Sequence, residues 1–175
     1  FANYVKQYES DYNKALADGE EMMKVTGDPF YAEYLERIAF NALPTQISKD
    51  FRLHQYYQQT NQVSISLGNH NFTTMQDGTA NLMGFLTGYP CCLSNLHQGW
   101  PKFTQNLWLS ASDGGLAALT YSPCTVTTEV KGVPVEIREV TDYPKSELVR
   151  LEVSPAEPLS FPLHLRIPSW AANPV

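Results

Sequence analysis

The sequence predicts an α+β protein in which helices come first and antiparallel strands follow. Apolar residues recur every three or four positions through residues 11–44, the spacing of a helix with one buried face. Through residues 116–167 they alternate with polar residues, the spacing of a half-buried strand. We therefore expect a helical domain over residues 1–112 and a partial β-sandwich domain over residues 113–175.

Two helices are expected before residue 45. The first ends at Gly27, because glycine accepts the left-handed backbone that closes many helices. The second begins with Asp28 as N-cap and Pro29 in the first turn, and it ends at Pro44. Its apolar positions form one stripe, which consists of Tyr31, Tyr34, Leu35, Ile38, Ala39 and Ala42. This stripe predicts a helix that packs against a core.

A long connection follows over residues 45–90. It is rich in Gln, Asn, Thr and Gly and has no sustained period, so we expect loops or short irregular strands. It also contains several aromatic residues, namely Tyr56, Tyr57, Phe72, Phe85 and Tyr89. Because disordered segments are poor in aromatic residues, this composition favours an ordered segment that forms a site.

The strands begin after Asp113-Gly114-Gly115. Alternating residues on both sides of Lys131-Gly132 predict a hairpin with a two-residue turn. Two further strands are expected around Leu151 and Leu165. Four or five short antiparallel strands leave sheet edges and one apolar face uncovered. We therefore expect the sheets to be completed by further polypeptide, from the same protein or from a partner chain.

Charge and hydropathy exclude some classes of partner. The formal net charge is −6, and the 12 basic residues are scattered, whereas nucleic-acid binding needs a clustered basic surface. No stretch approaches the roughly 20 apolar residues of a membrane span. We expect neither nucleic acid nor membrane as a partner, and a secreted or periplasmic location is favoured.

The adjacent cysteines Cys91 and Cys92 are the most distinctive chemical feature. Neighbouring cysteines cannot form an unstrained disulfide, so their value lies in thiolate chemistry or in binding a soft metal. The structural alternative is a pair of buried, unreactive thiols. The third cysteine, Cys124, lies at the start of an expected strand and is most simply structural.

Several motifs around these cysteines resemble glycoside hydrolase family 127, whose founding activity is that of a β-L-arabinofuranosidase. The resemblance is carried in order by residues 26–32 (TGDPFYA), 35–44 (LERIAFNALP), 54–56 (HQY), 61–63 (NQV), 91–92 (CC), 95–103 (NLHQGWPKF) and 113–118 (DGGLAA). Their order and spacing hold from about Glu20 to Trp170. The chain resembles a middle portion of a typical member.

The resemblance implies both a fold and a reaction. The fold would be the end of an (α/α)6 helical barrel that runs into a β-sandwich. The reaction would be retaining hydrolysis of a β-linked L-arabinofuranoside, from a plant-type or glycoprotein carbohydrate, with Cys91 as nucleophile. A zinc ion bound by Cys91 and Cys92 would keep the thiols deprotonated near neutral pH. A glycosyl-cysteine intermediate then gives retention through two inversions.

Three more site residues follow from matching positions. Glu36 matches a family carboxylate that faces the sugar, and Tyr56 matches a tyrosine near the nucleophile. His97 lies six residues after Cys91 and is a third substrate-binding candidate. The structural alternatives are a solvated helix-face charge for Glu36, a core aromatic for Tyr56 and a hydrogen-bonded structural histidine for His97.

One departure keeps a second function open. Tyr8-Glu9-Ser10 stands where the family has a Glu-x-Cys zinc motif, and the family's general acid/base would precede Phe1. The first hypothesis is a piece of a glycosidase whose remaining chain supplies the acid/base and the other zinc ligands. The alternative is a non-catalytic module for carbohydrate binding or assembly that kept the fold and lost the site.

Overall fold

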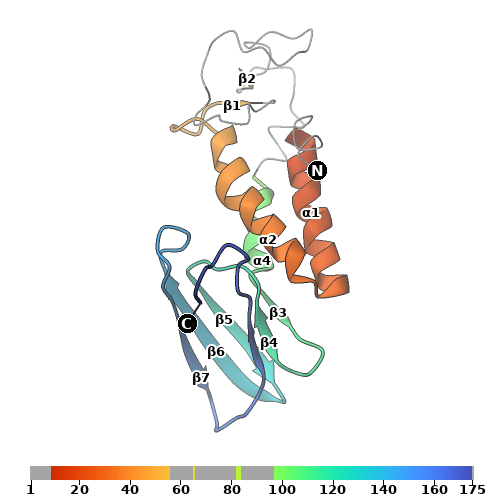
Figure 1. The fold of residues 1–175 in the computed structure, drawn as a ribbon, viewed down its shortest axis with the longest axis vertical. Helices are drawn as coiled ribbons and strands as arrows, with labels where there is room; N and C mark the ends of the chain where they lie inside the picture. The colour runs from red at the N-terminus through yellow and green to blue at the C-terminus, as the bar shows by residue number, and fades with distance from the viewer. Residues whose placement is uncertain (1–8, 56–64, 66–81, 84–96, 175) are drawn as a thin grey trace. The chain divides into compact units, whose positions relative to one another are not determined.

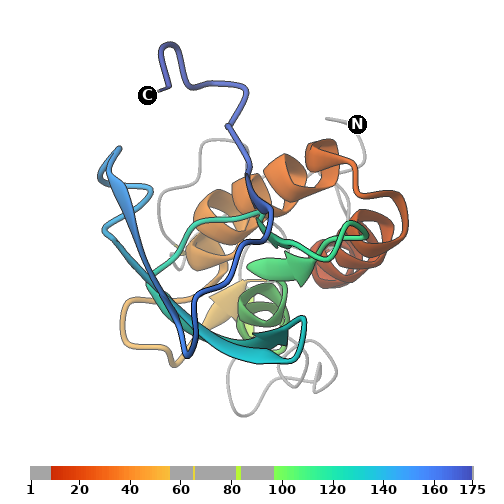
Figure 2. The same ribbon diagram turned by 90° about the horizontal axis from the view of Figure 1, so that it is seen from below.

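The computed structural model describes residues 9–55, 65, 82–83 and 97–174. The chain folds as two compact units. The first comprises Phe1–Glu21 and Tyr34–Phe103, and the second comprises Met22–Glu33 and Thr104–Val175. Figure 1 shows the order of helices and strands along the chain, and Figure 2 shows the same ribbon turned by a quarter turn.

The predicted helices and the turn between them are confirmed. Helix α1 spans Glu9–Thr26 and helix α2 spans Pro29–Arg37. Gly27 has a φ of 66°, and its N–H donates to the Met23 carbonyl over 2.9 Å, which closes α1 in the expected left-handed cap. The Asp28 Oδ1 atom accepts the Phe30 N–H at 2.9 Å and caps the start of α2.

The two helices pack closely at Gly19. A Cβ atom placed on Gly19 would lie 3.1 Å from Leu35 Cδ2 and 3.3 Å from the Tyr34 ring, which is tighter than ordinary contact. Leu35, Ile38 and Ala39 are buried, as expected for the stripe on the second helix, and Ala32, which the stripe did not include, is buried too. Glycine at position 19 therefore allows α1 and α2 to approach in the first unit.

The second helix does not continue as an α-helix to Pro44. It changes into a π-helix over Ile38–Ala42, where the Leu43 N–H donates to the Ile38 carbonyl at 3.0 Å. A short 3-10 turn over Pro44–Gln46 follows. Apolar spacing cannot separate these forms, because the faces of an α-helix and of a single π turn differ by one residue.

Short elements complete the described part of the first unit. Strand β1, His54–Gln55, pairs antiparallel with strand β2, Leu82–Met83. Helix α4 spans Gly99–Gln105 and crosses from the first unit into the second. Its Phe103 ring lies edge to face with Phe40 at a centroid distance of 5.5 Å, a contact within the first unit.

The second unit contains two three-stranded sheets. One has the order β3-β4-β8, formed by Trp108–Ser110, Leu116–Ala118 and Leu163–Leu165. The other has the order β5-β6-β7, formed by Cys124–Val130, Val133–Thr141 and Val149–Pro155. The expected fold class is confirmed, since helices precede sheets whose strand pairs are antiparallel with one exception.

The hairpin at Lys131-Gly132 is confirmed in detail. Val130 pairs with Val133, so two residues form the turn. Lys131 has a φ of 53° and Gly132 a φ of 80°. Positive φ at both central positions defines the turn type whose twist matches the flanking strands.

One expected pairing is wrong. Strand β8 runs parallel to β4, with Leu116 opposite Leu163 and Ala118 opposite Leu165. The strands come together at Gly115, where an added Cβ would lie 2.4 Å from the Pro162 carbonyl oxygen. Strand order is set by such tertiary contacts, which alternation along the sequence does not encode.

Within the described residues, no helix is long and apolar enough to cross a membrane.

Candidate functional site

The five site residues expected from the sequence divide into two described and three undescribed positions. Glu36 and His97 are placed by the structure, whereas Tyr56, Cys91 and Cys92 lie outside the described residues. The Glu36 side chain is only 5% exposed, so it is not the solvated helix-face charge of the structural alternative. His97 is exposed and lies in the turn that precedes α4.

Glu36 belongs to a group of polar side chains that the first unit buries. Glu20 is 4% exposed on α1, and His54 and Gln46 are 2% and 0% exposed near the other end of the helical segment. Charged residues are rarely buried unless they have partners or a function, because removing a charge from water is costly. The first unit therefore buries several polar side chains, one of which is Glu36.

Sequence patterns missed Glu20, although its neighbour gave a signal. Gly19 is a glycine inside a helix, where it costs about 1 kcal/mol relative to alanine and usually has a packing reason. Here the reason is the close contact with Leu35. Since Glu20 follows Gly19 and Glu36 follows Leu35, both carboxylates come from the same crossing of α1 and α2.

A π-helix begins at Ile38, two residues after Glu36. Single π turns inside helices occur often at functional sites, because the extra residue changes the direction of the side chains around it. Two side chains bond to carbonyls along this turn, Asn41 Nδ2 to Arg37 O at 3.0 Å and Thr45 Oγ1 to Ala42 O at 2.9 Å. They hold a segment whose main-chain bonding departs from the α-helical pattern.

The segment that follows the cysteines is anchored beside this π-helix. Phe103 of α4 is 3% exposed and packs on Phe40 of the π-helix. Helix α4 begins at Gly99, soon after His97. One aromatic contact therefore joins the helical segment that carries Glu36 to the segment that leads back to Cys91 and Cys92.

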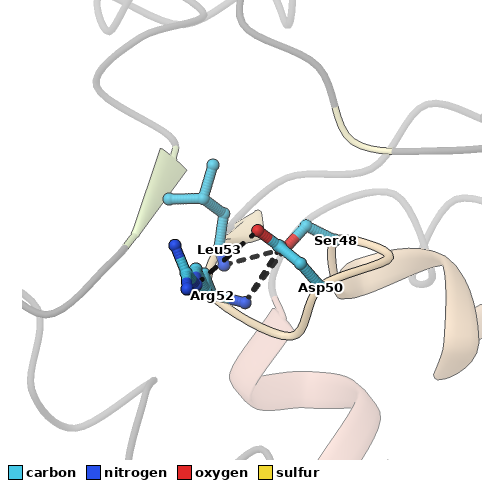
Figure 3. Close-up of polar contacts among 4 residues, drawn as sticks. All are labelled: Ser48, Asp50, Arg52 and Leu53. Atoms are coloured by element: carbon cyan, nitrogen blue, oxygen red, sulfur yellow. Dashed lines mark hydrogen bonds and ion pairs between the residues drawn. The ribbon is translucent and has the colours of Figure 1, made fainter.

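A tight loop precedes His54 and fixes the start of strand β1. Ser48 is the centre of this loop, shown in Figure 3: its Oγ–H donates to Asp50 Oδ1 at 2.5 Å, and its Oγ accepts the N–H groups of Arg52 at 3.1 Å and Leu53 at 2.9 Å. The bond from Ser48, followed by one from the Arg52 N–H to Asp50 Oδ1 at 3.2 Å, holds the pKa of Asp50 below its ordinary value. Phe51 takes a φ of 58° within the loop.

The loop closes an antiparallel bridge. Ile47 pairs with His54, and the Ser48 N–H donates to the Leu53 carbonyl at 2.8 Å. The bridge and the pairing of His54 with Met83 give His54 a defined place in the first unit. The connection over residues 45–90 is expected to be ordered and to form a site. Its start, residues 45–55, is ordered in this way.

The described side chains include no group suited to hold a metal ion. Among residues 9–55, 65, 82–83 and 97–174, no three His, Cys, Asp or Glu side chains are grouped closely enough to hold an ion. The donors expected for zinc, Cys91 and Cys92, lie outside these ranges.

Cys124 fits the structural role expected for it. Its Sγ lies 3.7 Å from Glu139 Oε2 in the second unit. Burial and the neighbouring Glu139 carboxylate raise the pKa of this thiol to about 11. Because the thiolate is the reactive form, Cys124 is poorly suited to nucleophilic chemistry near neutral pH.

Comparison with solved structures shows the fold. A crystal structure titled a GH127 beta-L-arabinofuranosidase from Geobacillus stearothermophilus T6 matches with a TM-score of 0.71 and 22% identity, covering 92% of this chain and 25% of that one. A glycoside hydrolase matches with a TM-score of 0.67 and 23% identity, over 91% and 25% of the two chains. A GH127 beta-arabinofuranosidase matches with 0.69 and 20%, over 89% and 22%.

These matches show that the chain spans about a quarter of the length of its structural relatives. No curated protein matches the sequence. Two family models match it in succession. The beta-L-arabinofuranosidase GH127 catalytic domain matches residues 10–105, and the GH127 middle domain matches residues 115–175. The chain therefore belongs to the GH127 beta-L-arabinofuranosidase family, in which it corresponds to part of the catalytic domain and to the middle domain.

Proposed function

We propose that this chain is part of a retaining glycosidase that releases β-linked L-arabinofuranose, or a related sugar, from a plant-type or glycoprotein carbohydrate. Cys91 is the nucleophile, and Glu36, Tyr56 and His97 bind the substrate. The observation that carries the proposal is the burial of Glu36 inside the stretch that matches the GH127 catalytic domain. The division into domains at residue 112 stays a prediction.

The burial of Glu36 supports a role in binding or catalysis. A surface glutamate on an amphipathic helix keeps its charge in water at no cost, whereas Glu36 is 5% exposed and follows the buried Leu35. A buried carboxylate is most useful where it meets a polar ligand such as a sugar hydroxyl, since a charge-assisted hydrogen bond is strong in a dry site. The π turn after Glu36 adds a second functional indication.

The reaction proposed for Cys91 balances without an oxidant or reductant. Its thiolate attacks the anomeric carbon, a carbon–sulfur bond forms, and the carbon–oxygen bond to the leaving alcohol breaks. Water then attacks the same carbon, releases the sugar and returns the thiolate. A general acid/base from another part of the protein transfers the proton to the leaving alcohol and later takes one from water.

Zinc suits the donors proposed for it. Two thiolates are soft ligands that zinc prefers, and metal binding keeps a thiol deprotonated near neutral pH. We propose Cys91 and Cys92 as ligands in the intact protein, with the remaining ligands supplied by other parts of it. Ser10 in Tyr8-Glu9-Ser10 replaces the expected cysteine ligand, so the ligand set differs from the family pattern.

A non-catalytic module for carbohydrate binding or assembly is the second candidate. The change at Tyr8-Glu9-Ser10 favours it, because the loss of a metal ligand often accompanies the loss of catalysis. The joint presence of Glu36, Cys91 and Cys92 favours the enzyme. The two candidates differ in turnover, which a direct assay measures.

The test is hydrolysis of an aryl β-L-arabinofuranoside by the intact protein and by Glu36→Gln. The variant keeps size and hydrogen bonding but removes the charge, and we expect kcat/KM to fall by about 100-fold or more. Glu21→Gln is the matched control, because Glu21 is exposed on α1. Unchanged turnover in Glu36→Gln would reject a site role for this carboxylate, and a wild-type protein without turnover would favour the non-catalytic candidate.

A further inference from the structure

The second unit carries a tryptophan that is both firmly held and half exposed. The Trp170 side chain is 52% exposed, and its ring is stacked on Tyr143 with a centroid distance of 6.0 Å and an interplanar angle of 23°. Tyr143 is 7% exposed and meets Tyr121 edge to face at 5.7 Å. Trp170 therefore extends a row of aromatic rings from the interior of the unit to its surface.

The residue before Trp170 is tied to helix α2. The Ser169 Oγ–H donates to Glu33 Oε1 at 2.6 Å, and the Ser169 N–H donates to Glu33 Oε2 at 3.2 Å. The Ala171 N–H donates to the Pro168 carbonyl at 3.0 Å, which closes a turn around Ser169 and Trp170. Two hydrogen bonds, a turn and a ring stack thus fix the position of Trp170 in advance.

A second exposed aromatic residue lies on the helix that Ser169 contacts. Phe30 is 62% exposed and precedes Glu33 by three residues on α2, within the second unit. Residues three apart on a helix share a face, with their Cβ atoms about 5–6 Å apart. Phe30 therefore shares a face of α2 with Glu33, the residue that is bonded to Ser169.

We propose that Trp170, Phe30 and Ser169 form a carbohydrate-binding subsite on the second unit. A flat, fixed aromatic ring offers apolar surface to the C–H face of a sugar at little cost in conformational entropy. The Ser169 hydroxyl gives its proton to Glu33, so its lone pairs are available to a sugar hydroxyl. Glu33 is a positioning residue that holds Ser169 in place.

The size and charge of the patch favour a sugar over other occupants. Half of a tryptophan and part of a phenylalanine offer on the order of 200 Å², far below the roughly 800 Å² that each partner buries in a stable protein interface. An anionic partner is disfavoured by the Glu33 carboxylate and by the net charge of −6. A neutral sugar of one or two rings fits both conditions.

The choice of an arabinose-containing ligand rests on the proposed function, in which the subsite would help to hold a polymeric substrate. Binding is measured by affinity electrophoresis of the intact protein in soluble arabinan, with dextran as the control polysaccharide. We expect Trp170→Ala to weaken binding by tenfold or more and Trp170→Phe to retain most of it. Phe30→Ala should weaken binding severalfold. Val25→Ala is the matched control, since Val25 is 80% exposed in the same unit.

Two results would overturn the proposal. One is a wild-type protein that migrates equally in arabinan and dextran, and the other is binding within twofold of wild type in Trp170→Ala and Phe30→Ala. Thermal melts show whether Trp170→Ala still folds, and Phe30→Ala decides the matter if it does not. Hydrolysis of a small aryl glycoside by Trp170→Ala should equal that of wild type. If the variants lose binding and the wild type shows no hydrolysis, the proposed catalysis is rejected and the subsite is still supported.

Discussion

Replacing Glu139 by alanine should destabilise the second unit severely. The Glu139 side chain is 2% exposed on β6, and its carboxylate accepts hydrogen bonds from Trp108 Nε1–H at 3.0 Å and from the Ser122 N–H at 2.9 Å. Trp108 lies on β3 of the other sheet, so this carboxylate joins the two sheets. Alanine would leave the buried Trp108 donor and the part-buried Ser122 donor without an acceptor.

The magnitude follows from those two donors. A buried donor that loses its partner costs about 1–3 kcal/mol, and removing one member of a buried charged network costs about 3–5 kcal/mol. We expect the free energy of unfolding to fall by about 3–5 kcal/mol. For a protein of about 150–250 residues, each kcal/mol lowers the midpoint of thermal unfolding by roughly 2–4 °C. The midpoint should therefore fall by at least roughly 6 °C.

The assay is thermal and urea unfolding of wild type, Glu139→Ala and a control, Glu152→Ala. Glu152 lies on the neighbouring strand β7, and its ion pairs with Arg138 at 3.8 Å and Arg150 at 3.3 Å are exposed, so its loss should cost less than about 1 kcal/mol. A Glu139→Ala midpoint within about 2 °C of that of the control corresponds to a stability difference of no more than about 1 kcal/mol. That result would refute the idea that Glu139 joins the sheets.

Four further predictions concern the same unit. Burial raises the pKa of the Glu139 carboxyl above its ordinary value of 4.5. The stability that this shift contributes is therefore full below pH 4.5 and is lost as the pH rises through the pKa of the folded state. Glu139→Gln should flatten that part of the pH dependence of unfolding, and an unchanged slope would contradict this. The pKa of the Cys124 thiol rises from 9.0 to about 11, so alkylation at pH 8 should be about 100-fold slower in folded than in unfolded protein. Peptide mass spectrometry measures both rates, and equal rates would exclude the shift. Gly115→Ala should destabilise by about 1–3 kcal/mol because its Cβ would meet the Pro162 carbonyl at 2.4 Å. The Cβ of Gly132→Ala would meet no atom within 4 Å, but the residue must keep a φ of 80°, at a cost of about 1–2 kcal/mol. Urea unfolding measures both glycine variants, and stabilities equal to wild type would refute both predictions.

Local features of the fold were predictable because short-range chemistry determines them. Gly27 and Asp28 define the end of one helix and the start of the next through backbone bonds that their residue types favour. Lys131-Gly132 determines its hairpin in the same way, through two positive φ angles. Each signal needs only the few residues around it.

Features that depend on distant residues were not predictable. The parallel pairing of β8 with β4 requires the close approach of Gly115 and Pro162, which are far apart in the sequence. The π-helix after Glu36 has nearly the apolar spacing of an α-helix. Glu139 lies between these cases, because alternation with Val135 and Ile137 already places it on the buried face of β6.

The candidate site was predictable only through family resemblance. Residue chemistry alone drew attention to Cys91 and Cys92 as thiolates or soft-metal ligands, and it left a pair of buried, unreactive thiols as the alternative. It ranked Glu36 as an ordinary surface charge, and the buried position of Glu36 was not visible in the helical period. A polar residue on the buried face of a helix is recognisable once the packing of that helix is known.

The most direct test of the central claim is to trap the sugar on Cys91. The intact protein is denatured with acid during steady-state turnover of an activated β-L-arabinofuranoside, digested and examined by peptide mass spectrometry. The account predicts a peptide that contains Cys91 and is heavier by one pentosyl group, with no such adduct on Cys124 and none in Cys91→Ser. Turnover that continues in Cys91→Ser, or an adduct on another residue, would contradict the account.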